Sequence, residues 1–169
     1  MTLDIEILND FISESKSLIE ISLETLSEIE EDPSLRKKLA EYGNSIDRIM
    51  GGAKNLALMA DGNHPLNFVA DYAALCKAVG YKASQLDNNP QFYFVCVALL
   101  LDATETMLEM LNHLHDETHS FKNYISETFL ERLKWVSEQF GKEYRETVGD
   151  KGLAQNEIDD LLKKLGLGV

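Results

Sequence analysis

Three polar side chains in the first half of the chain have chemically complementary groups at helical spacing. Asp47 follows Asn44 by three residues and precedes Lys54 by seven, with Gly51 between them, so all four share one face of a helix. The Asn44 amide can orient a water molecule, the Asp47 carboxylate can exchange a proton, and the Lys54 ammonium can meet an anionic phosphoryl group. The alternative is an ordinary solvated helix surface without catalysis.

The helix that carries these residues is expected at about 34–60. Its apolar residues recur every three or four positions on the opposite side, which predicts that the polar face is exposed. This stripe consists of Leu35, Leu39, Tyr42, Ile46, Ile49, Ala53, Leu56 and Ala60. The adjacent Gly51 and Gly52 each cost a helix about 0.5–1 kcal/mol relative to alanine. They therefore serve either the close approach of a partner or close packing between helices.

Further helices are predicted on either side of this one. Prolines occur only in three turn-like stretches, and apolar periodicity marks long helical segments between them. The additional segments span about 4–30, 66–86, 91–113 and 120–140. Long helices with short connections predict an all-α fold, an antiparallel bundle of about five helices in a domain at 1–140.

The C-terminal residues differ in character from the bundle. The stretch 141–154 contains three glycines without apolar periodicity, which indicates a linker or the frayed end of the fifth helix. Residues 155–169 form an amphipathic helix signal, with a cap at Asn156, a stop at Gly166, and an apolar face of Ile158, Leu161, Leu162 and Leu165. Such a helix can dock into a partner's groove or pack on its own bundle.

Charge and composition restrict the partners. The chain has 169 residues and a net charge of −13, so nucleic acid and anionic membrane surfaces are poor partners and a basic patch is a better one. The longest apolar run, 92–101, is too short to span a bilayer. Cys76 and Cys96 lie in apolar helical stretches and indicate core thiols in a reducing compartment, so we expect a cytoplasmic protein.

Two other groups of residues are assigned structural roles. His113, His115 and His119 fall in a predicted inter-helix turn, which favours a solvated loop over a metal site. Trp135 is expected in the core. We therefore expect no metal site in this chain.

The sequence "AEYGNSIDRIMGGAKNLAL" resembles the second helix of histidine phosphotransfer (HPt) domains of the chemotaxis kinase CheA type. The resemblance extends loosely over about 3–140 and is specific only in this helix. The family's phospho-accepting histidine corresponds to Asp47, and its lysine to Met50. The resemblance therefore implies a helical bundle with a receiver-docking surface at Gly51 and Gly52, but without phosphotransfer through histidine.

The end of the chain, "QNEIDDLLKKLGL", is similar to the C-terminal peptide with which the chemotaxis phosphatase CheZ binds the response regulator CheY. A related pattern opens the flagellar switch protein FliM. The similarity implies that partner-binding residues are Ile158, Asp159, Asp160, Leu161, Leu162 and Leu165. The helical Asp-to-Gln pattern of the CheZ active site is missing.

Both resemblances imply one kind of partner, a CheY-like receiver protein. They imply a two-component chemotaxis regulator that binds the receiver and promotes its dephosphorylation, with Asn44, Asp47 and Lys54 as candidate catalytic residues. The alternative is a non-catalytic pseudo-HPt adaptor or sequestering module. No cofactor of its own is expected, and Mg²⁺ is expected on the partner receiver. A homodimer is a further alternative, because the tail can also dock on a second copy of the chain.

Overall fold

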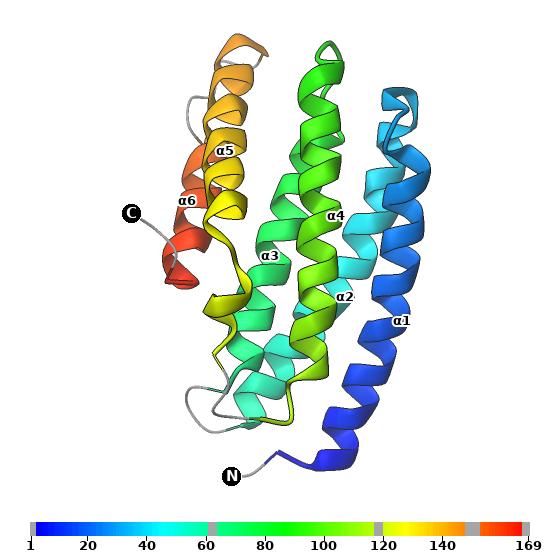
Figure 1. The fold of residues 1–169 in the computed structure, drawn as a ribbon, viewed down its shortest axis with the longest axis vertical. Coiled ribbons are helices and arrows are strands. Elements are labelled where there is room, and N and C mark those ends of the chain that lie inside the picture. The colour runs from blue at the N-terminus through cyan, green and yellow to red at the C-terminus, as the bar shows by residue number, and fades with distance from the viewer. Residues whose placement is uncertain (1–2, 61–63, 117–119, 148–152, 167–169) are drawn as a thin grey trace.

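The protein is a bundle of long helices, seen in a computed structural model that describes residues 3–60, 64–116, 120–147 and 153–166 (Figure 1). The α-helices are α1 (Ile5–Ile29), α2 (Leu39–Met59), α3 (Leu66–Ala83), α4 (Pro90–Asn112), α5 (Glu127–Thr147) and α6 (Leu153–Lys164). Short 3₁₀ helices, η1 (Pro33–Lys38) and η2 (Phe121–Tyr124), precede α2 and α5. The described residues contain no strand, which confirms the predicted all-α fold.

Local sequence signals set most of the helix boundaries. The Asp4 carboxylate accepts a hydrogen bond from the Glu6 amide at 2.8 Å and caps α1. The second helix begins later than the apolar stripe predicts, because Pro33–Lys38 forms the separate turn η1. Asp32 caps that turn through the Ser34 amide at 3.0 Å.

Helix α4 contains the longest apolar run of the sequence, 92–101, and packs within the bundle. It packs against α1 and α3 and also contacts α5, and Figure 1 shows it between α1 and α5. Buried polar groups form hydrogen bonds between α4 and its neighbours. The Thr104 hydroxyl of α4 lies 3.0 Å from the Tyr42 hydroxyl of α2, and the Tyr72 hydroxyl of α3 donates to the Ala103 carbonyl at 3.1 Å.

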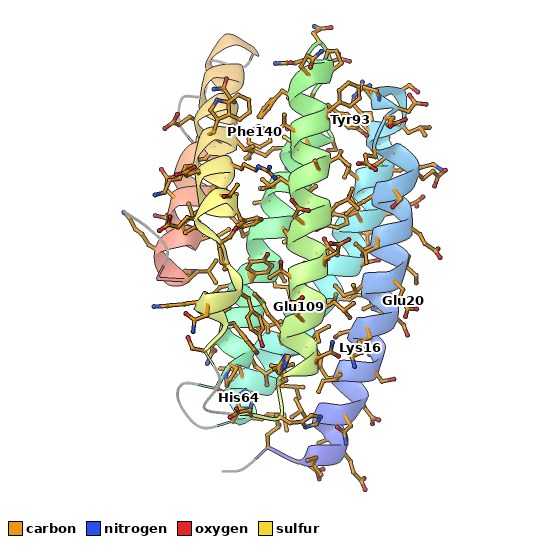
Figure 2. The ribbon with its side chains drawn as sticks, viewed as in Figure 1. Lys16, Glu20, His64, Tyr93, Glu109 and Phe140 are labelled. Carbon is orange, nitrogen blue, oxygen red and sulfur yellow. The ribbon has the colours of Figure 1, made fainter. Side chains whose placement is uncertain are left out.

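A tyrosine from α4 closes the C-terminal end of α1. The Tyr93 hydroxyl donates a hydrogen bond to the Ile29 carbonyl at 2.8 Å, and Figure 2 shows Tyr93 at the end of the bundle where α4 begins. The last turn of α1 contains no basic residue. The Ile29 carbonyl accepts two hydrogen bonds, one from a buried side chain of another helix and one from the Asp32 amide at 3.2 Å just beyond α1.

The prediction that Trp135 belongs to the core is wrong. Its side chain is 44% exposed, and its ring meets the ring of the buried Phe92 edge-on, at 5.8 Å between centroids. Helix α5 packs through Leu133, Val136 and Phe140 instead, which leaves Trp135 to one side of the buried stripe.

The C-terminal region continues the bundle. Residues 141–147, in the first half of the predicted linker, form the end of α5, and 148–152 lie outside the described residues. Helix α6 already begins at Leu153, so Asn156 lies within it instead of capping it. Gly166 follows α6 with a φ of 73°, the left-handed conformation in which glycine commonly ends a helix.

Helix α6 packs against α3 and α5 of the same chain (Figure 1). The side chains of Ile158, Leu162 and Leu165 are buried there, at 0%, 3% and 1% exposed. Of the two alternatives that the amphipathic pattern leaves open, the structure contains the packed helix. Across the described ranges, no helix combines the length and apolar character needed to cross a bilayer.

Candidate functional site

A cleft lies between α2 and α3, and the polar side chains of Asn44, Asp47 and Lys77 lie in a lining that is otherwise largely apolar. Its volume is about 280 Å³. The residues that line it from α2 are Leu39, Ala40, Gly43, Asn44 and Asp47. Those from the other side are Lys77 and Tyr81 on α3 and Ser84, which caps the end of α3. Asn44 and Asp47 are exposed, because the buried stripe of α2 faces the opposite way.

Asp47 forms an ion pair across this cleft. The Lys77 ammonium lies 2.6 Å from Asp47 Oδ1, and the two side chains are 45% and 51% exposed. An ion pair this exposed contributes at most about 1 kcal/mol to stability, so its main effect is to orient the carboxylate. No signal in the sequence links Lys77 to Asp47, because its position opposite Asp47 depends on how α2 and α3 pack.

Lys54 is exposed on α2 but is not among the residues that line the cleft. Helical periodicity places it on the same face as Asp47, two turns further along α2. The cation next to Asp47 is Lys77 instead. The predicted contact of Lys54 with a phosphoryl group stays a prediction, and Lys77 becomes the better-placed candidate.

The two adjacent glycines have different surroundings. A Cβ atom added at Gly51 would have no neighbour within 4 Å, whereas one added at Gly52 would lie 2.9 Å from the ring of Phe11 on α1. Gly52 therefore allows close packing of α1 on α2, one of the two roles that the sequence suggests. Gly51 leaves the surface of α2 open next to the cleft, as the other role requires.

Helix α6 borders the same region. A larger cleft of about 510 Å³ is lined by Met50 on α2, by Ala74, Lys77, Ala78 and Tyr81 on α3, and by Asp160, Leu161 and Lys164 on α6. Lys77 and Tyr81 line both clefts, so the two are neighbours along α3. Tyr81 is 61% exposed and presents an aromatic ring at the surface beside both clefts.

The residues predicted to bind a partner through the tail divide between two sides of α6. Ile158, Leu162 and Leu165 are buried in the bundle, and Asp159 and Leu161 are half-buried. Among the six, only Asp160 is exposed. The apolar face of the tail is thus covered by its own chain in this structure.

The histidines and cysteines form no comparable site. His113 ends α4 with Nδ1 2.9 Å from the Glu109 carbonyl, and His115 is exposed, while His119 lies outside the described residues. Within the described ranges, no group of three or more potential ligands is placed to hold a metal ion. Burial raises the pKa of the Cys76 thiol to about 12 and raises that of Cys96 as well, so neither is a ready nucleophile.

The comparisons with known proteins identify no relative. No protein-family model matches the chain, and neither a curated protein nor a solved structure matches it. The relationship to HPt domains and to the CheZ tail therefore stays a prediction from the sequence. The described residues form a cleft between α2 and α3 that contains Asn44, Asp47 and Lys77 and is bordered by the packed tail helix.

Proposed function

We propose that this protein binds a CheY-like receiver domain and promotes hydrolysis of its phospho-aspartate. The observation that carries the proposal is Asp47, which stands exposed beside Asn44 in an open cleft and is oriented by Lys77 at 2.6 Å. The two resemblances at opposite ends of the sequence support the same partner. The packing of α6 next to Met50 supports it further, since both regions then meet the partner on one side of the bundle.

The groups in the cleft suit hydrolysis of an acyl phosphate. A water oxygen attacks the phosphorus in line, the bond from phosphorus to the receiver's aspartate oxygen breaks, and the aspartate carboxylate leaves with the electron pair. The Asn44 amide orients the water, and Asp47 accepts its proton. Lys77 lies where it can hold Asp47 in place and offset the charge of the phosphoryl group.

The chain supplies these groups without a cofactor of its own in this proposal. The receiver carries the Mg²⁺ that accompanies its phosphoryl group. We place the reaction in the cytoplasm, in keeping with the two buried, unpaired cysteines.

The decay of a phosphorylated receiver, measured with and without the protein, tests the proposal. We expect faster decay with the intact protein. Replacement of one positioning or proton-accepting group, in Asn44→Ala or Asp47→Asn, should reduce the acceleration by about 10²-fold or more. Asn55→Ala is the matched control, because Asn55 is also an exposed amide on α2 but lies outside the cleft lining.

Two lysine variants test which cation takes part. Lys77→Ala should slow the reaction, and Lys54→Ala should change it less, because only Lys77 lies within contact of Asp47. Equal losses from both variants would contradict the role assigned to Lys77. An unchanged decay rate with the intact protein would remove the phosphatase proposal altogether.

The second candidate function is a non-catalytic adaptor or sequestering module for a receiver. The observation in its favour is the same ion pair, because Lys77 occupies one carboxylate oxygen of Asp47 and offsets its charge. This function predicts receiver binding with an unchanged phosphoryl lifetime. Titration of the receiver together with the decay assay separates the two candidates.

A further inference from the structure

The apolar face of α6 has two competing uses. Ile158, Leu162 and Leu165 are buried against α3 and α5 in this structure. The same three residues are those that a receiver-binding tail must present to its partner. A face that is already buried in the bundle is inaccessible to a second protein until α6 separates from α3 and α5.

We infer that α6 is an intramolecular latch, whose apolar face is held by α3 and α5 in the closed state and by the receiver in the open state. The inference rests on the proposed function, and it adds a regulatory step to it. The receiver competes with the bundle for α6, and its apparent affinity falls in proportion to the fraction of molecules that are open.

The packing of α6 suits a helix that can be released. The helix has only 12 residues, and a helix this short is marginal in water without tertiary contacts. Its contact with the rest of the bundle is incomplete, because the cleft of about 510 Å³ separates part of it from α2. Leu161 is only half-buried on that side.

The position of the latch couples it to the candidate site. Asp160, Leu161 and Lys164 of α6 line one cleft together with Lys77 and Tyr81 of α3, and Lys77 is the partner of Asp47. A protein that docks over Asp47 therefore meets α6 at the edge of the same surface. Docking of the receiver over Asp47 and release of α6 therefore take place at adjacent parts of one surface.

A reversible crosslink in the full-length chain tests the latch. Ala74→Cys on α3 and Lys164→Cys on α6 place two thiols in the lining of one cleft, outside the buried apolar face of α6. A bifunctional thiol reagent with a cleavable spacer then fixes α6 on α3. The native Cys76 and Cys96 are buried with raised thiol pKa values and should react little under the same conditions.

The measured quantity is the affinity for a CheY-like receiver carrying a stable phosphoryl analogue. We expect the crosslinked protein to bind at least about tenfold more weakly than the same protein after cleavage, since the crosslink removes the open state. The control pair is Thr106→Cys with Thr128→Cys, which line a cleft between α4 and α5 away from α6. Its crosslinking should leave the affinity unchanged.

The outcomes separate the latch from the function on which it rests. Equal affinities before and after cleavage, with a complex formed in both states, would overturn the latch and leave receiver binding intact. Equal loss of affinity in the control pair would also overturn it, because the effect would then not belong to α6. Failure of the uncrosslinked protein to bind the receiver at all would refute the proposed function, and the latch with it.

Discussion

The adjacent glycines of α2 offer a matched pair of substitutions with opposite expected effects. Gly51→Ala adds a methyl group to open space, whereas Gly52→Ala adds one that would lie 2.9 Å from Phe11 Cε2 and 3.1 Å from Cδ2. Both changes increase helix propensity equally, because both positions lie inside α2. Only the second forces a ring on α1 to move.

The expected changes in the free energy of unfolding follow from the gain in helix propensity and the cost of overpacking. Gly51→Ala should raise the free energy of unfolding by about 0.5–1 kcal/mol, the propensity gain alone. Gly52→Ala has the same gain, but overpacking against Phe11 costs about 1–3 kcal/mol. The difference between the two variants should therefore be about 1–3 kcal/mol, in favour of Gly51→Ala.

Urea unfolding followed by circular dichroism measures both free energies under one set of conditions. Phe11→Leu provides a further check, because it removes the ring atoms that the new methyl group meets. In a double-mutant cycle, most of the free energy of unfolding lost in Gly52→Ala should be recovered when Phe11 is already leucine. The effect of Gly51→Ala should be the same with either residue at position 11.

The same pair tests the surface role of Gly51. If the receiver approaches the α2 backbone there, Gly51→Ala should weaken receiver binding while it stabilises the fold. The packing explanation for Gly52 is refuted if Gly52→Ala is as stable as Gly51→Ala. The docking explanation for Gly51 is refuted if its variant binds the receiver as tightly as the parent chain.

Three further predictions concern the core and the tail. Tyr42→Phe removes the hydroxyl that lies 3.0 Å from Thr104 Oγ1 and should lower the free energy of unfolding by about 0.5–1.5 kcal/mol, measured by urea titration; no loss would mean that this hydrogen bond contributes nothing net. Burial raises the pKa of Cys76 from 9.0 to about 12. The free energy of unfolding that the neutral thiol contributes is therefore complete below pH 9, and it falls by about 1.4 kcal/mol per pH unit as the pH rises towards 12. Unfolding at pH 8 to 11 should show this fall, and Cys76→Ala should make it shallower. Gly166→Ala forces a side chain into a φ of 73° next to Lys122 and should cost about 1–2 kcal/mol locally, seen as faster amide exchange in α6 and contradicted by unchanged exchange there.

Helical periodicity was sufficient to predict the helices of this bundle and the buried side of α2. Ile46, Ile49 and Ala53 are all fully buried, because a 3.6-residue repeat fixes which side of a helix faces a core. The 3₁₀ turn at Pro33–Lys38 was missed, because its apolar spacing is compatible with a helix and only Pro33 marks the change.

The relations between helices could not be predicted in this way. The contact of Lys77 with Asp47 depends on the register of α3 against α2, and periodicity within each helix contains no information on that register. The placement of α6 has the same origin. An amphipathic stripe predicts that Ile158, Leu162 and Leu165 will be covered, but it contains no information on whether the chain's own bundle or another protein covers them.

The hydrogen bond from Tyr93 to the Ile29 carbonyl has a consequence for how the bundle forms. The last turn of α1 lacks a basic side chain and is followed by Glu30, Glu31 and Asp32, so its own charges oppose the negative end of the helix dipole. The Asp32 amide closes that turn locally at 3.2 Å, and a side chain 64 residues away in sequence adds a second hydrogen bond to the same carbonyl, which ties the turn to α4. Amides at the end of α1 should thus exchange with solvent in the same cooperative unit as α4, not as an independently fraying end.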